Sequence, residues 1–424
     1  MSSVIRSPSP SIAQAVGVSA LCALLFMVAQ PYGTPDPLGL GIGSSWTAVC
    51  YIFAVPVLLI QLTRQARIQL TILDWLLFAY LAAVLVTWPT GNDRQASAKA
   101  IVALLGQVGV FYAARLVLAD SRLAGRLIAT VLVVEIAAIQ LMAIGSHVGH
   151  GLFNRLTEYA SPHAWGGRPE ISFLAAIQFA LLLGIGWRSR PAAFRLAHFC
   201  LVSTIMVELV FLFSRLAWLA ACGALAVWGL MTLRAVGPRW RALAFACVSL
   251  LAVAVFVRDP TLSRLAESMV GAGKVEATPG MRFTLWRRAT RLIRDHPLAG
   301  VGLGNFQAAY VPYFDPKDPT DDNRRGIHAH NLFLHQAGEV GIPGGLVYAA
   351  LWGLGLFAGW RAESGAFYAM VVVAVMGLGE NMFLDAVFAP RARLHTISWL
   401  LLAMIVTEWS RRRVPRVNGQ GAPA

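Results

Sequence analysis

The feature that most constrains this chain is a series of apolar runs, each about 20 residues long, that recurs along most of its 424 residues. A helix of about 20 residues crosses the roughly 30 Å hydrocarbon core of a bilayer. Only 13% of the residues are charged, whereas soluble domains average about 25%. Because a helix satisfies its own backbone hydrogen bonds without water, the pattern predicts an all-α polytopic membrane protein.

About twelve of these runs have the length of a transmembrane helix. They cover residues 11–30, 43–62, 70–89, 99–117, 126–147, 169–187, 196–213, 216–233, 241–257, 334–359, 365–387 and 394–410. The first is expected to be a retained span, because it lacks a convincing signal-cleavage site. The chain then divides into helices 1–9 (1–257), a large loop (258–330), helices 10–12 (331–410) and a basic tail (411–424).

Arginines in the short links predict the orientation of these helices. With both termini in the cytoplasm, most link arginines fall on the cytoplasmic side, as the positive-inside rule requires. Topology thus accounts for the net charge of +14, and no basic soluble module with interleaved aromatic residues suggests nucleic acid as a partner. The arginines assigned to the cytoplasmic side are Arg6, Arg64, Arg67, Arg115, Arg122, Arg126, Arg188, Arg190, Arg195, Arg234, Arg239, Arg241, Arg361, Arg411, Arg412, Arg413 and Arg416.

The long loop at 258–330 lies on the outer side in this topology. Loops of this length are usually functional. The loop ends in "HAHNLFLHQAGEVGIPGG", residues 328–345. His328 and His330 are therefore expected outside the membrane, directly before the tenth span.

Arg215, in "FSRLAWLA", lies where spans 7 and 8 join on the outer side. A charged side chain at membrane depth usually faces a cavity or a partner, and a guanidinium suits phosphate oxygens. Arg215 is thus either an anion clamp or an arginine that reaches to lipid phosphates. The outer link at 151–170, which contains Arg155, is expected to line the same cavity.

The stretch "MRFTLWRRATRLIRDHP", residues 281–297, predicts a basic amphipathic helix. Arg287, Arg291 and Arg294 share one face of it, and another face carries Leu285, Ala289, Leu292 and Ile293. Such a helix suits the membrane surface or contact with a phosphorylated substrate. The glycines of "GVGLGN", residues 300–305, favour a tight turn near a ligand but do not form a dinucleotide site.

Three interpretations of the histidines stay open: a general base, a structural pair that caps the tenth span, or a metal site. Histidine accepts protons near neutral pH, which suits a base. A metal site needs three or four ligands, and His328 with His330 supplies two. The five cysteines all lie in apolar runs without a C-x-x-C pair. No metal or other cofactor is expected.

Carboxylates in the apolar runs favour a rival class, a transporter or lipid flippase. Glu135, Glu208, Glu339 and Glu380 either form a proton or ion path or are paired groups between helices. The aspartate-rich "FDPKDPTDDN", residues 314–323, lacks the spacing of a calcium-binding loop and is expected to be a solvated turn.

Several of these stretches together resemble the O-antigen ligase and polymerase superfamily. "HAHNLFLHQAGEVGIPG" is similar to its H-x-H-N…G-x-x-G signature, and "FSRLAWLA" to its arginine at the start of an outward-facing helix. "GMRFTLWRRATRLIRDHPLAGVGLGNF" is similar to its loop pattern. The link at 151–170 differs most, with "YASPH" in place of a glycine-rich segment.

The resemblance implies a GT-C-like membrane glycosyltransferase of a bacterial inner membrane, with its active site on the periplasmic face. The implied partners are an undecaprenyl-pyrophosphate-linked O-antigen donor, a lipid A–core acceptor and membrane lipids. The alternatives are a polymerase and a protein O-oligosaccharyltransferase. The transfer is expected to be inverting and metal-independent.

The resemblance also implies roles for particular residues. His330 is the expected catalytic base because it directly precedes Asn331, as in the family signature. Arg215 is expected to act in catalysis and in pyrophosphate binding. The remaining substrate-binding residues implied are Arg282, Arg155, His328 and Arg288.

Overall fold

The computed structural model describes twelve stretches of the chain. They are residues 17–21, 23–24, 42–63, 68–120, 130, 134, 168–185, 192–211, 215–232, 277–314, 329–379 and 389–413. The predicted spans at 126–147 (apart from 130 and 134) and 241–257, and most of the first span, lie outside these residues.

Every predicted span that falls within the described residues has an α-helix, and no strand occurs in this part of the chain. The helices are α2 (Ile42–Thr63), α3 (Ile72–Thr87), α4 (Arg94–Asp120), α6 (Arg168–Gly184), α7 (Ala192–Phe211), α8 (Arg215–Thr232), α13 (Leu332–Arg361), α14 (Ala366–Gly379) and α15 (Ala389–Arg413). The loop contributes α11 (Ala277–Asp295) and α12 (Phe306–Tyr310). The predicted all-helical class is thus confirmed for the described residues.

Three of the described helical segments are long and apolar enough to cross a membrane: Ile72–Thr90, Arg94–Ala119 and Leu332–Arg361. Shorter apolar helices accompany them at Thr47–Ile60, Ser172–Gly184, Leu196–Met206, Leu216–Thr232 and Ala366–Leu378. The chain is a helical membrane protein by these features, and the total of twelve spans stays a prediction.

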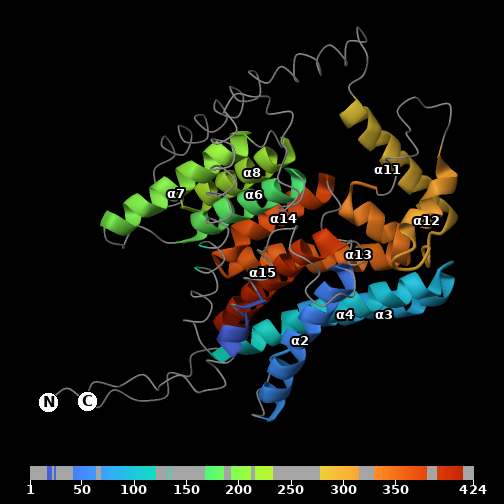
Figure 1. Cartoon of the computed structure of the whole chain (residues 1–424), viewed down its shortest axis with the longest axis horizontal. Helices are drawn as coiled ribbons and strands as arrows, with labels where there is room; N and C mark the ends of the chain where they lie inside the picture. Colours follow the sequence, from blue (N-terminus) through green and yellow to red (C-terminus); the bar gives the residue numbers. More distant parts are fainter. Residues whose placement is uncertain are drawn as a thin grey trace, which may run out of the picture.

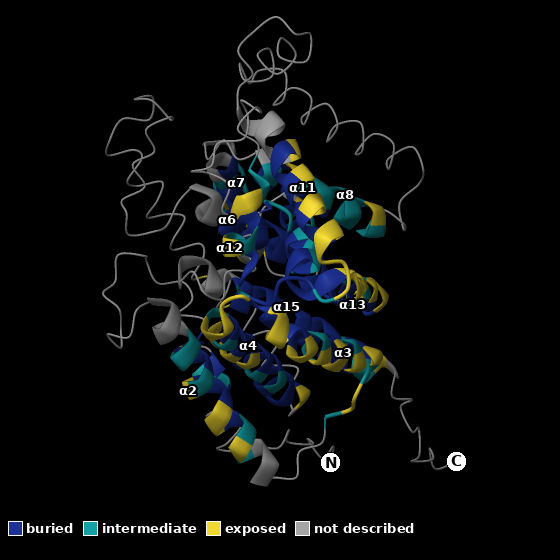
Figure 2. Ribbon diagram, turned by 90° about the vertical axis from the view of Figure 1, so that its right-hand side faces the viewer, coloured by how far each residue is buried: buried dark blue, intermediate teal, exposed yellow. Residues whose placement is uncertain are grey.

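The helices pack as a bundle with the loop helices at one end. α13 lies along α3, and α15 contacts α4, α13 and α14. α14 also packs against α6 and α8, while α11 and α12 contact α13 (Figure 1). Large apolar side chains on the outer faces of α2 and α3 are exposed, among them Ile52, Leu59, Trp75 and Val86 (Figure 2). Such faces suit contact with lipid rather than with water.

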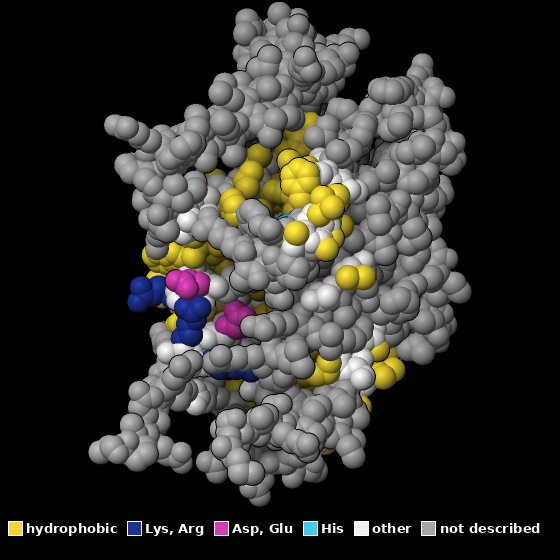
Figure 3. All heavy atoms as spheres, turned by 90° about the vertical axis from the view of Figure 1, so that its left-hand side faces the viewer, with side chains coloured by type: hydrophobic (Ala, Val, Ile, Leu, Met, Phe, Trp, Pro, Cys, Tyr) yellow, Lys and Arg dark blue, Asp and Glu magenta, His cyan; other side chains and the backbone are white. Residues whose placement is uncertain are grey.

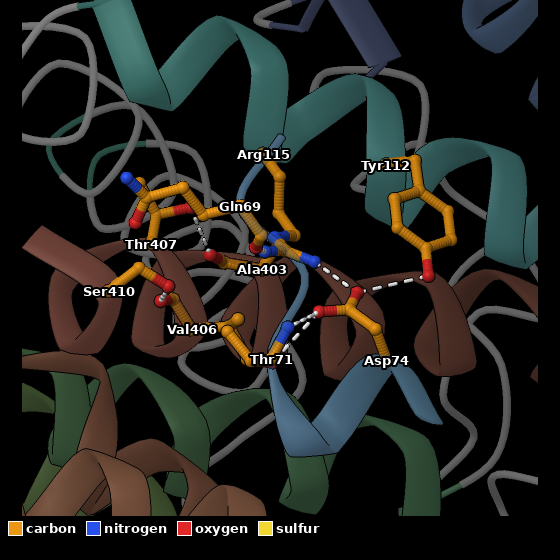
Figure 4. Close-up of polar contacts among 9 residues, drawn as sticks. All are labelled: Gln69, Thr71, Asp74, Tyr112, Arg115, Ala403, Val406, Thr407 and Ser410. Atoms are coloured by element: carbon orange, nitrogen blue, oxygen red, sulfur yellow. Dashed lines mark hydrogen bonds and ion pairs between the residues drawn. The ribbon is translucent and has the colours of Figure 1, made fainter. Parts of the chain in front are cut away.

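A buried ion pair joins α3 and α4 at the end of the bundle that the arginine bias assigns to the cytoplasm. Asp74 pairs with Arg115 and accepts a hydrogen bond of 3.0 Å from the Tyr112 hydroxyl (Figure 4). Arg115 Nη2 also donates to the Gln69 carbonyl at 3.0 Å. Arg115, which was assigned to the cytoplasmic side, lies in the last turns of α4. It is 4% exposed there, and Asp74 neutralises its charge.

Other predicted cytoplasmic arginines lie at the same end. Arg411 of α15 donates to the carbonyls of Leu118 and Ala119 at the end of α4. Arg412 forms an exposed ion pair of 3.3 Å with Glu363, in the turn between α13 and α14. Figure 3 views this end, where Lys and Arg side chains lie beside Asp and Glu. The structure therefore places Arg115, Arg411 and Arg412 at one end of the bundle, which agrees with their assignment to one side of the membrane.

We expect Asp74→Ala to destabilise the protein strongly, because it leaves the Arg115 charge buried without its partner. Breaking a buried pair in this way costs about 3–5 kcal/mol. The midpoint of thermal unfolding in detergent measures the effect. Glu363→Ala removes the acidic partner of an exposed pair and is expected to cost about 0–1 kcal/mol. An unchanged midpoint for Asp74→Ala would show that the buried pair contributes nothing.

Candidate functional site

The opposite end of the bundle brings together the link between α3 and α4, the glycine-rich segment of the loop and the start of α13. Asn305 connects the first two. Its Oδ1 accepts a hydrogen bond of 2.8 Å from the Asp93 N–H, and its Nδ2 donates to Ser97 Oγ at 2.7 Å. The link between α3 and α4 and the loop at 258–330 are therefore joined by a buried side chain.

Helix α13 is broken one-third of the way along. Val340 (φ −114°, ψ 15°) and Gly341 (φ 74°, ψ 171°) leave the helical conformation. Two residues later, Pro343 has no N–H to donate to the Glu339 carbonyl. The carbonyls of Gly338 and Glu339 thus lose their usual partners within the helix, in a region where an unpaired backbone group is costly.

The glycine-rich loop supplies the missing partners. Val301 N–H donates to the Gly338 carbonyl at 3.0 Å, and Gly302 N–H donates to the Glu339 carbonyl at 2.8 Å. In return, Ile342 N–H donates to the Pro297 carbonyl at 2.8 Å. The loop therefore completes the hydrogen bonding of the broken helix.

Glycine is required where these two backbones meet. Gly300 has φ 61°, and a Cβ there would lie 2.4 Å from the Glu339 carbonyl oxygen. Gly341 has φ 74°, and a Cβ there would lie 2.1 Å from the Leu298 carbonyl oxygen. The predicted tight turn of "GVGLGN" is present, and it is set against α13.

A buried polar network surrounds the break. Glu339 Oε1 accepts a hydrogen bond of 2.8 Å from Gly304 N–H and lies 3.5 Å from His335 Nε2. Gln336 accepts a hydrogen bond from Tyr80 of α3, and the Phe306 ring stacks on His335 with centroids 4.0 Å apart. The Glu339 carboxylate therefore connects the loop to α13.

His330 lies directly before α13 in a strained conformation. Its φ is 46°, in the left-handed region that non-glycine residues seldom occupy. Such a residue costs about 1–3 kcal/mol and occurs preferentially at functional sites. Ala329, before it, is fully buried in the apolar cluster of the loop helices, whereas His330 is half-buried.

Asn331, which follows His330, is fixed by hydrogen bonds to α13 and α14. Its Oδ1 accepts hydrogen bonds of 3.0 Å from the N–H groups of Phe333 and Leu334, so it is the N-cap of α13. Its Nδ2 donates to the Leu378 carbonyl of α14 at 3.2 Å. The cap starts the helix at Leu332, two residues before the predicted span at 334–359. Asparagine is a preferred N-cap residue, and this signal was available in the sequence.

Helix α8 begins at Arg215 and runs antiparallel to α14. Near one end of the pair, the Tyr368 hydroxyl lies 3.8 Å from Met231 Sδ. Further along, Gly223 faces Val371 and Val375. This register brings the start of α8 to the end of α14, where Leu378 binds Asn331. The backbone of Arg215 therefore lies at the same end of the bundle as His330.

The structure describes the remaining predicted site residues to different extents. Arg282 lies in α11, but only its backbone is described, as for Arg215. Arg155 and His328 lie outside the described residues. Arg288 is 2% exposed, donates to the Tyr310 carbonyl at 3.1 Å and places its guanidinium over the Tyr310 ring. It thus joins α11 to α12, and its role in pyrophosphate binding stays a prediction.

Helix α11 is amphipathic as predicted. Leu285, Ala289, Leu292 and Ile293 are buried, and Arg287, Arg291 and Arg294 are exposed. The apolar face packs on protein, since α11 contacts α13 and a Cβ at Gly338 would meet Leu292. This helix therefore does not lie with its apolar face in the membrane.

No group of three or more His, Cys, Asp or Glu side chains in the described part of the chain is arranged to hold a metal ion.

Comparison with known families identifies the region that contains these features. The model of the O-antigen ligase family, Wzy_C, matches residues 199–349. The match runs from α7 to beyond the break in α13 and includes Arg215, the loop and His330. The predicted resemblance to the O-antigen ligase and polymerase superfamily is therefore confirmed. No curated protein matches the chain.

We expect Gly341→Ala to weaken the contact between the loop and α13, because its Cβ would overlap the Leu298 carbonyl and φ 74° disfavours alanine. Gly353→Ala is the matched control in the same helix, since no atom lies within 4 Å of the added Cβ. The thermal midpoint should fall for Gly341→Ala and stay or rise for Gly353→Ala, since alanine favours a helix by about 0.5–1 kcal/mol. Equal shifts for the two variants would contradict the role of the break.

Proposed function

We propose, from the premise that residues 199–349 form an O-antigen ligase family domain, that the protein is an O-antigen ligase. It would transfer O-antigen polysaccharide from undecaprenyl pyrophosphate to the lipid A–core oligosaccharide. The reaction would take place at the periplasmic face of the bacterial inner membrane. The family supports a membrane glycosyltransferase of the ligase or polymerase type, and the choice of ligase is our proposal.

The observation that carries this proposal is the placement of His330. The residue is held in a left-handed conformation between Ala329, which is anchored in the loop, and Asn331, which is anchored to α13 and α14. Fixing a strained residue from both sides suits a catalytic group whose orientation matters. In the proposed reaction, His330 accepts the proton of the acceptor hydroxyl.

Arginines would stabilise the leaving group. Arg215 opens α8 at the end of the bundle where His330 lies. Arg215 would bind the pyrophosphate of the donor together with Arg282, Arg155 and His328. Arg288 would join them if its side chain leaves Tyr310. A guanidinium fork matches phosphate oxygens and stabilises the negative charge that develops on them.

The proposed chemistry is a single displacement. The acceptor oxygen attacks the anomeric carbon while the bond from that carbon to the phosphate oxygen breaks. The proton passes to His330, and undecaprenyl pyrophosphate leaves with the bonding electrons. Attack opposite to the leaving group inverts the anomeric centre. Arginines would take the place of a metal at the pyrophosphate.

A transporter would rely on the buried carboxylates instead. Glu339 is engaged by Gly304 N–H within the loop junction. Glu135, Glu208 and Glu380 would then have to form the path, and their side chains lie outside the described residues. If the protein is a transporter, variants of these three glutamates should lose function. Variants of His330 should then keep it.

We expect purified protein to transfer lipid-linked glycan to lipid A–core in EDTA. His330→Ala should lower the rate by about 10²–10⁴-fold, the usual worth of a general base. Arg215→Lys should lower it by roughly 10²-fold, because a point charge replaces a fork. His198→Ala, in α7, is the control and should retain activity. Full activity of His330→Ala, or loss in EDTA that Mg²⁺ restores, would contradict the mechanism.

We expect deletion of the gene to leave lipid A–core without O-antigen, while long glycan accumulates on the lipid carrier. Electrophoresis of the lipopolysaccharide and analysis of the carrier lipid measure both. A polymerase would give a different result, since its loss leaves core that carries a single repeat unit. Unchanged lipopolysaccharide would exclude both reactions.

A further inference from the structure

The exposed face of α11 carries three arginines in a row, Arg287, Arg291 and Arg294, which we term the arginine stripe. Their i, i+4, i+7 spacing places them on one side of the helix. At a rise of 1.5 Å per residue, the outer two lie about 10 Å apart along the axis. The opposite side of α11 is buried against α13, so the stripe points away from the protein.

The stripe is strongly cationic. Asp295 is the sole acidic residue within Ala277–Asp295, and its Oδ2 accepts a hydrogen bond of 2.6 Å from the Tyr313 hydroxyl. Arg288 faces the other way, with its guanidinium on the Tyr310 ring. The charge that the stripe presents therefore attracts an anionic ligand, and guanidinium groups favour phosphate.

Exposed apolar side chains flank the stripe. Phe283 is 62% exposed and contacts Trp286 edge to face at 5.6 Å, and Leu298, beyond the other end of the helix, is 77% exposed. Aromatic and aliphatic side chains beside arginines are typical of the boundary between lipid and water. This composition favours a phosphate that belongs to a lipid over a free phosphate ion.

The stripe lies at the end of the bundle that carries His330. α11 leads directly into the segment whose Pro297, Val301 and Gly302 bind the break in α13. Figure 2 views this end and shows exposed residues along α11. A headgroup bound to the stripe would thus be kept on the side of the molecule where transfer is proposed.

We propose that the arginine stripe is the docking site for phosphate groups on the sugar headgroup of the acceptor lipid. The proposal rests on the proposed function for the identity of that lipid. A row of guanidinium groups about 10 Å long suits a headgroup that carries more than one phosphate. It holds the acceptor near the site, whereas Arg215 and His330 act on the donor and the hydroxyl.

Direct binding tests the proposal without catalysis. Purified full-length protein in detergent is titrated with lipid A–core, and with the same lipid after its phosphates are removed, and bound lipid is counted by native mass spectrometry. We expect R291Q/R294Q to bind the phosphorylated lipid roughly 30-fold more weakly, at about 5-fold per arginine. The double variant R361Q/R412Q, at the other end of the bundle, should bind like the wild type.

Several outcomes overturn the proposal. One is equal binding of phosphorylated and dephosphorylated lipid by the wild type. Another is equal loss of affinity in the two double variants. A third is competition by phosphatidylglycerol at the same concentration, which would make the stripe a general contact with anionic lipid. R291K/R294K should retain much of the binding, which separates loss of charge from misfolding.

The transfer assay separates this proposal from the proposed function. If the function holds, R291Q/R294Q should raise KM for the phosphorylated acceptor by a similar factor and leave kcat unchanged. The same variant should behave like wild type with dephosphorylated acceptor. Phosphate-dependent binding without any transfer by the wild type would support the docking role of the arginine stripe and contradict the ligase activity. Transfer with an unchanged KM would reject the stripe and keep the ligase.

Discussion

The structure depends most on how the break in α13 is satisfied. A helix in a membrane ordinarily pairs all of its backbone groups internally, and a break exposes carbonyls that lipid cannot bind. Here the N–H groups of Val301 and Gly302 donate hydrogen bonds to those carbonyls, and the Pro297 carbonyl accepts one from the Ile342 N–H. The loop and the helix are therefore one structural unit, although the loop is polar and the helix apolar.

This unit determines which side chains lie at the end of the bundle that carries the loop. Loop helices α11 and α12 form an apolar cluster with Ala329, and α13 starts at the Asn331 cap two residues later. His330 lies between these two anchors. The same packing buries one side of α11 and leaves its arginines outside. The described part of the loop thus has an apolar cluster of its own.

Much of the fold was predictable, because the length of an apolar run and the period of an amphipathic helix are local signals. The described helices at the predicted spans and the two sides of α11 follow from such signals. Pairings between distant residues do not. The sequence alone assigns Arg115 to a link between helices, and its ion pair with Asp74 is seen only in the structure. Glu339 reads as a lone carboxylate because its partner, the Gly304 N–H, has no side chain. His330 was selected by a family signature, whereas its backbone conformation was visible only in three dimensions.

The order of these segments along the chain has a consequence for assembly. Residues 297–302 are synthesised before Gly338 and Glu339, so the donors exist by the time the two halves of α13 emerge from the ribosome. Under the predicted topology the loop must cross the bilayer before it can reach these carbonyls. The second half of α13 then gains its final hydrogen bonds only after the loop has arrived beside it.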